Sequence, residues 1–177
     1  MKVNGVHYRS IWYDYESEKV LIIDQRWLPH DFRIVPLERL GDFAAAIRDM
    51  WVRGAPLIGA TAAYGMAIAM TEDATDEGLR QAYDTLIATR PTAVNLRWAL
   101  DRVRKMLSHK SASERRDEAL KLAHHMAEED VGINKRIGEQ GLEIIEKIAE
   151  EKSNGEPVRI LTHCNRRAVD INRYAVT

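Results

Sequence analysis

Hydrophobic and polar positions divide the 177-residue chain into a strand-rich beginning and a long helical remainder. β-Branched and aromatic residues dominate 6–13 and 20–23, and a polar stretch separates them, which predicts a β-hairpin or small meander. After Pro29 and Pro36, apolar residues recur every three or four positions. This spacing predicts a first amphipathic helix that contains Leu37, Leu40, Phe43, Ala44 and Ile47.

The helical remainder contains several further periodic segments. The segment 55–70 begins with Ala-Pro, is rich in alanine and glycine and carries no charge, so we expect a helix buried on most sides. A third helix is predicted over 76–88, and Thr92 is the expected N-cap of a fourth that runs to Val103. Residues 112–151 predict one long helical region with a charged outer face.

The last part of the chain has a different pattern. A linker at 153–157 follows the helical region, and the apolar run 158–161 predicts a strand. Because a strand needs partners, 158–177 is expected to open a second, incomplete α/β domain. The predicted class is α+β, with a β-hairpin and helical bundle in residues 1–152 and the linker and second-domain start in 153–177.

Composition and charge narrow the function classes. The net charge is −1 and the pI is near 6.6, which gives no global attraction to nucleic acid or anionic lipid. No apolar run approaches the roughly 20 residues of a membrane span, and the N-terminus has no apolar signal core. A single cysteine fits a reducing cytoplasm. The sequence contains no Walker loop, dinucleotide fingerprint or metal-ligand cluster.

Two arginines precede predicted helix starts. Arg53 is followed by Gly54, which lets backbone N–H groups approach an anion, and Arg90 stands before Pro91 in an extended segment. Each guanidinium fork matches phosphate oxygens, and each helix start adds positive potential. The alternatives are that Arg53 pairs with a carboxylate and that Arg90 is a solvated loop charge. The repeated arrangement makes one shared anion site the hypothesis to test.

Cys164 lies between His163 and Asn165, just after the predicted strand. A thiolate at the carboxyl end of such a strand could be stabilised by an imidazolium or a following helix start. The alternative is a small, buried, unreactive residue. The adjacent His124 and His125 point about 100° apart on a helix and are expected to be surface and boundary residues rather than metal ligands.

Three stretches resemble the family that unites S-methyl-5-thioribose-1-phosphate isomerase, ribose-1,5-bisphosphate isomerase and the α, β and δ subunits of translation initiation factor 2B. They are 52–59 with the alanine-rich helix after it, 90–100, and 162–165. The turn at 24–29 also looks like the family's early strand and turn. The likeness covers nearly all of residues 1–165, and within the family the chain resembles the methylthioribose-1-phosphate isomerases.

The resemblance implies an aldose–ketose isomerase of methionine salvage, which converts 5-methylthioribose 1-phosphate to 5-methylthioribulose 1-phosphate without a cofactor or metal. It implies that Arg53, Gly54, Ala55 and Arg90 bind substrate and that Cys164 is catalytic, together with an aspartate from a Rossmann-like C-terminal domain. It also implies a cytoplasmic homodimer. The alternatives are an isomerase of ribose 1,5-bisphosphate or 5-deoxyribose 1-phosphate, or a non-catalytic regulatory subunit of the factor 2B type.

The sequence departs from the family after Asn165. The family continues with small residues resembling Ala-Gly-x-x-Ala-Thr and then a complete Rossmann-like domain, whereas this chain continues with Arg166-Arg167 and stops at Thr177. Bulky arginines prevent the close backbone approach that small residues allow. We therefore expect a truncation with an out-of-frame tail; the alternatives are an end introduced deliberately, a processed chain or a genuine ending. In each case we expect an inactive N-terminal half of an isomerase, and self-association or fraying from about residue 153.

Overall fold

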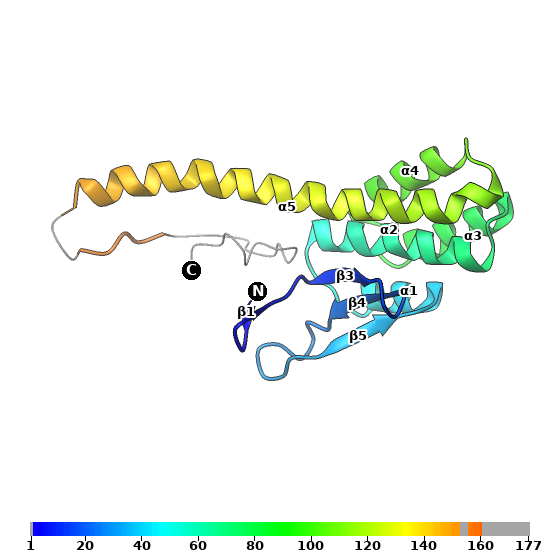
Figure 1. The fold of residues 1–177 in the computed structure, drawn as a ribbon, viewed down its shortest axis with the longest axis horizontal. Coiled ribbons are helices and arrows are strands. Elements are labelled where there is room, and N and C mark those ends of the chain that lie inside the picture. Colours follow the sequence, from blue (N-terminus) through cyan, green and yellow to red (C-terminus); the bar gives the residue numbers. More distant parts are fainter. Residues whose placement is uncertain (1, 153–155, 161–177) are drawn as a thin grey trace.

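The computed structural model describes residues 2–152 and 156–160, which form two small sheets and a bundle of five helices (Figure 1). The strands are β1 (Lys2–Val3), β2 (Val6–His7), β3 (Ile11–Asp14), β4 (Lys19–Ile23) and β5 (Ile34–Leu37). The helices are α1 (Leu40–Arg48), α2 (Ala55–Glu72), α3 (Asp76–Ile87), α4 (Val94–Leu107) and α5 (Ala112–Glu150). The predicted α+β class is confirmed, and the domain boundary expected after residue 152 stays a prediction.

The larger sheet has the antiparallel order β3-β4-β5. β3 and β4 form the hairpin that the sequence predicts, while Val6–His7 belongs to a separate ribbon with β1. The third strand was not predicted, because Leu37 was assigned to the first helix, which begins at Leu40 instead. Pro36 argues against a strand, because proline has no N–H to donate to a neighbouring strand. It is tolerated in β5 because this strand lies at the edge of the sheet.

The predicted helices are confirmed with small changes at their starts and ends. Thr92 is not the cap of α4, because a turn in which Ala93 N donates to the Arg90 carbonyl (3.0 Å) moves the N-cap to Ala93. The long region forms one continuous helix, α5, despite its glycines. The strand predicted at 158–161 is wrong over 158–160, which pair with no strand among the described residues, while Leu161 lies outside them.

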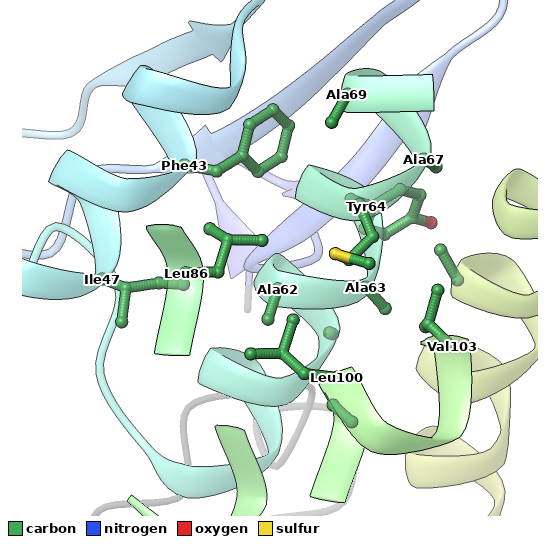
Figure 2. Packing of buried hydrophobic residues seen from close by; sticks show 14 of the residues in the cluster. Phe43, Ile47, Ala62, Ala63, Tyr64, Ala67, Ala69, Leu86, Leu100 and Val103 are labelled. Atoms are coloured by element: carbon green, nitrogen blue, oxygen red, sulfur yellow. The ribbon is translucent and has the colours of Figure 1, made fainter. Parts of the chain in front are cut away.

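Helix α2 is the centre of the core, as its composition predicts. Every residue from Leu57 to Ala67 is buried, and Figure 2 shows α2 side chains between those of α1, α3 and α4. The small residues permit this packing: a Cβ added at Gly65 would lie 3.0 Å from the Phe43 Cβ. Because α2 is enclosed, its first turn is held firmly at one end of the bundle.

An aromatic cluster joins the larger sheet, α2 and α5. The Tyr64 hydroxyl lies 2.9 Å from His124 Nδ1, and the rings of Tyr13 and Tyr15 also contact the imidazole. His124 Nε2 is buried without a hydrogen-bond partner in the part of the chain that the structure describes. Burial therefore lowers the pKa of His124, and the nearby Glu128 offsets this effect in part.

The lowered pKa of His124 makes stability depend on pH. In the unfolded chain the imidazole of His124 takes up a proton near pH 6.5, whereas in the folded chain it stays neutral at that pH. The stabilisation of the fold by the neutral ring is therefore complete above pH 6.5. We expect the free energy of unfolding to fall as the pH decreases through 6.5 toward the lowered pKa. Urea titrations at several pH values measure this slope. His124→Gln should reduce it, whereas the exposed neighbour change His125→Gln should leave it intact, and equal slopes in both variants would contradict the assignment.

Candidate functional site

The starts of α2 and α4 lie side by side at one end of the bundle. A Cβ added at Gly59, in the second turn of α2, would lie 3.3 Å from the carbonyl oxygen of Asn95 and 3.4 Å from the Ala99 Cβ. The two helices therefore approach each other almost backbone to backbone within their first two turns. Arg53 and Arg90 precede these two starts, so the fold brings together the two loops that the sequence predicts as one site.

The first-turn N–H groups of these two helices lack side-chain caps. Gly54 is the N-cap of α2 with a φ of 98°, a conformation that favours glycine, and neither Gly54 nor Ala93 provides a side-chain acceptor. In α3 the Thr75 hydroxyl accepts from Gly78 N (3.1 Å), and in α1 and α5 the carboxylates of Asp42 and Glu114 accept from the backbone N–H of the N-cap residue. Open N–H groups and the helix dipole make the paired starts of α2 and α4 suitable for an anion.

The two arginines leave their guanidinium groups available to this end of the bundle. Arg53 is exposed and Arg90 is half-buried. Within residues 2–152 and 156–160, neither forms an ion pair with a carboxylate, whereas many other described arginines do. The alternative in which a carboxylate holds Arg53 therefore has no support in the described part of the chain.

A turn after β4 braces the loop before α2. The Asp24 carboxylate is buried and accepts hydrogen bonds from Arg26 Nε (2.9 Å) and Nη2 (2.6 Å). Burial alone would raise the pKa of Asp24, but the hydrogen bonds and charge of Arg26 outweigh it and lower the pKa. The Arg26 guanidinium also lies 4.5 Å from the Trp51 ring centroid, and Gln25 N donates to the Trp51 carbonyl (2.8 Å). The sheet thus fixes the segment that carries Arg53.

An open cleft of about 410 Å³ adjoins the paired helix starts. It lies between α2, α4 and α5, and its lining is mostly apolar. The residues around it are Pro56, Gly59, Ala60, Val94, Asn95, Trp98, Met126, Glu129, Asp130 and Ile133. An apolar cleft beside two open helix starts can hold a ligand with an anionic end and an apolar end.

Two acidic side chains lie on the α5 side of the cleft. Glu129 accepts a hydrogen bond from Arg102 (2.7 Å), and this contact lowers the pKa of Glu129. The Asp130 carboxylate accepts from Asn134 Nδ2 (3.0 Å), so these two residues, one helical turn apart, meet on one face of α5. Arg102 therefore compensates the charge of Glu129 at the edge of the cleft.

Sequence reasoning missed the α5 side of the cleft. Met126 and Ile133 belong to α5, and nothing in their local pattern shows that this helix crosses the start of α2. Trp98 of α4 lines the same cleft and is 52% exposed. One signal was available in the sequence. The helix period places Val94 and Trp98 of α4 on one face, and that face lines the cleft.

The thiol expected in the site, Cys164, lies outside the described residues, as do His163 and Asn165. Its relation to the paired helix starts therefore stays a prediction.

His124 is half-buried and His125 is exposed, in agreement with their expected boundary and surface positions. Within the described residues, no three histidine, cysteine, aspartate or glutamate side chains form a group that could hold a metal ion. None of the described helices combines the length and apolar character needed to cross a membrane.

Comparisons with known proteins agree with the motifs. Over 165 residues the chain is 57% identical to the methylthioribose-1-phosphate isomerase of Brucella anthropi. The aligned region covers 93% of this chain and 45% of that protein. The crystal structure of 5-methylthioribose 1-phosphate isomerase from Pyrococcus horikoshii OT3 matches with a TM-score of 0.71 and 37% identity, over 78% of this chain and 41% of that one. The delta subunit of translation initiation factor eIF-2B from A. fulgidus matches with the same TM-score and identity, over 42% of its length.

The chain therefore spans less than half the length of these relatives. The profile of the Initiation factor 2 subunit family matches residues 51–175, which include both arginine segments and the region around Cys164. Because this match covers more than half of the chain and the fold agrees, the chain belongs to the Initiation factor 2 subunit family.

Proposed function

We propose that this chain supplies the phosphate-binding half of an aldose–ketose isomerase that acts on 5-methylthioribose 1-phosphate. The observation that carries the proposal is the pairing of two uncapped helix starts, each preceded by an arginine without a carboxylate partner in the described residues. The similarity to proteins named methylthioribose-1-phosphate isomerase gives the substrate and the reaction.

In this proposal each residue of the site has a separate task. Arg53 and Arg90 bind the phosphate oxygens through charge-assisted hydrogen bonds, and the N–H groups after Gly54 add donors that need no rearrangement. Ala55, beside them, leaves room for the sugar ring. Cys164 acts at the sugar carbons, where a proton must move between C1 and C2 for an aldose to become a ketose.

The chain alone is expected to be inactive, since the resemblance assigns the partner aspartate to a part of the relatives that the aligned 165 residues do not include. We further propose the domain division at residue 152, with 153–177 as the start of the second domain. A cytoplasmic location and the homodimeric state of the full-length relatives belong to the same proposal.

A fused protein tests the function directly. Residues 1–165 of this chain are joined to the part of the Brucella anthropi relative that follows its aligned region, which the 57% identity makes compatible. We expect this fused protein to isomerise 5-methylthioribose 1-phosphate and to lose the activity with Cys164→Ser. A folded fused protein that binds the substrate but does not isomerise it would contradict the catalytic role.

Substrate tests separate the two enzymatic alternatives. The same fused protein is assayed with ribose 1,5-bisphosphate and 5-deoxyribose 1-phosphate. The apolar lining of the cleft favours a substrate with an uncharged, apolar C5 group, so we expect the bisphosphate to react more slowly. Faster reaction with the bisphosphate would transfer the proposal to that substrate.

A regulatory role is the second candidate. It is favoured because the eIF-2B delta subunit matches this chain with the same TM-score as the isomerase from Pyrococcus horikoshii. A regulatory subunit acts through protein surfaces and has no need of the two open arginines. Isothermal titration of the fused protein with the sugar phosphate distinguishes the two roles. Binding that disappears with Arg90→Ala supports the enzyme, whereas no binding by a folded protein supports the subunit.

A further inference from the structure

Helix α5 continues past the bundle that covers its first half. Its buried residues end at Val131, and from Gly132 to Glu150 no residue of the helix is fully buried. Figure 1 shows this second half extending beyond the start of α2. About 19 residues at 1.5 Å each give an overhang of roughly 28 Å. The overhang therefore owes its stability to its own helix contacts or to a partner.

The overhang carries a stripe of exposed isoleucines. Their exposed fractions run from 41% at Ile133 to 61% at Ile144. At 3.6 residues per turn, the stripe members lie within about 60° of one another around the helix axis. The stripe consists of Ile133, Ile137, Ile144 and Ile148.

The stripe continues the face that the first half of α5 buries. At the same helical period, Ala119, Ala123 and Met126 fall in the same angular sector as the stripe, and all three are buried. One helix face is thus apolar along its whole length, but the bundle covers only the part before Val131. Exposed apolar stripes of this kind mark interaction surfaces.

We propose that the stripe pairs with the stripe of a second copy of this chain, with the two α5 helices antiparallel. The spacing of the isoleucines is symmetric about the peptide between Gln140 and Gly141. In an antiparallel pair centred there, Ile133 of each copy lies opposite Ile148 of the other, and the two inner isoleucines also face each other. Gly141 lies at the centre, where a Cβ would meet nothing within 4 Å in the single chain and the helices can approach closely.

The charges of the overhang favour the antiparallel direction. Its first third carries Lys135 and Arg136, whereas its remainder carries four glutamates and one lysine: Glu139, Glu143, Glu146, Lys147 and Glu150. An antiparallel pair places the basic part of one copy along the acidic part of the other, and a parallel pair would align like charges. Arg136 and Glu143 lie on the same flank of the stripe, so each can meet the other across the two-fold axis.

Sedimentation velocity of the 177-residue chain tests the pairing, from about 1 to 300 µM, with helix content followed by circular dichroism. We expect a concentration-dependent dimer. The double change Ile137→Asp and Ile144→Asp should weaken dimerisation at least about 100-fold, because it buries charge at the interface. The matched control Leu142→Asp should leave the dimer intact, since Leu142 is 49% exposed but lies on the opposite side of α5.

Charge reversal tests the direction. Arg136→Glu should weaken the dimer about 10-fold, and adding Glu143→Arg should restore it to within about 3-fold. In a Cys164→Ser background, Gly141→Cys should form a disulfide between copies, whereas Glu151→Cys should not, because antiparallel copies place the two ends far apart. A monomer at about 300 µM, or a dimer unaffected by the isoleucine changes, would overturn the pairing. A disulfide at position 151 would overturn the antiparallel direction.

Discussion

Arg53→Ala is expected to lower kcat/KM of the fused protein for 5-methylthioribose 1-phosphate by at least about 100-fold. A desolvated arginine–phosphate contact is worth a few kcal/mol when one partner is removed, and about 2.7 kcal/mol corresponds to 100-fold. Arg53 has no carboxylate partner in the described part of the chain, so its removal strands no acidic group there. The loss should therefore come from substrate binding and not from the fold.

Two comparisons make the Arg53 result specific. Arg53→Lys keeps the charge but not the planar fork, so about a tenfold loss is expected. Arg80→Ala serves as the control, because Arg80 lies on α3 and is paired with Glu77 (2.6 Å) and Asp84 (2.9 Å). Competition by 5-methylthioribose, which lacks the phosphate, should be unchanged by Arg53→Ala. Equal weakening of both ligands would show that Arg53 does not contact the phosphate.

Local sequence patterns were sufficient for most of the helical bundle. The uncharged, alanine-rich segment at 55–70 predicts a helix buried on most sides, and α2 is enclosed as expected. Patterns failed where a local signal competed with a tertiary one. Leu37 fits the helical spacing that follows it, yet it pairs with Val20 in the sheet. Thr92 has the chemistry of a cap, but the turn at Arg90 places Ala93 at that position.

The candidate site was predictable in its charges and not in its shape. Arginine before a helix start is visible in the sequence, and Gly54 signals the positive φ that the loop requires. The contact between the second turn of α2 and Asn95 is a property of two packed helices, and no periodicity contains it. The cleft depends further on α5, whose lining residues begin at Met126, well after the last α4 residue of the cleft, Trp98.

The second large effect is expected at Arg115, whose replacement should remove much of the stability of the bundle. Its guanidinium is buried and donates to the Leu107 carbonyl (3.1 Å) and the Ala74 carbonyl (2.8 Å), and it also pairs with Asp76. One side chain of α5 thus holds the end of α4 and the turn between α2 and α3. Sequence patterns gave no indication of this role, because the residue looks like any other charge on a long helix.

Arg115→Met keeps the length of the side chain but removes the hydrogen bonds to the Ala74 and Leu107 carbonyls and the ion pair with Asp76. Although Lys110 N still donates to the Leu107 carbonyl (3.0 Å), the loss of these charged contacts should cost about 2–4 kcal/mol of the free energy of unfolding. Arg115→Lys should recover only part of that loss, since one ammonium cannot reproduce the three-way fork. Urea unfolding of the 177-residue chain measures both, with Arg116→Met at the exposed neighbouring position as the control, expected within about 1 kcal/mol of the unchanged protein. Comparable losses at 115 and 116 would mean that the three contacts contribute no more than an ordinary surface charge. A large loss at 115 alone would identify this contact as the one that holds the start of α5 against the end of α4 and the turn between α2 and α3.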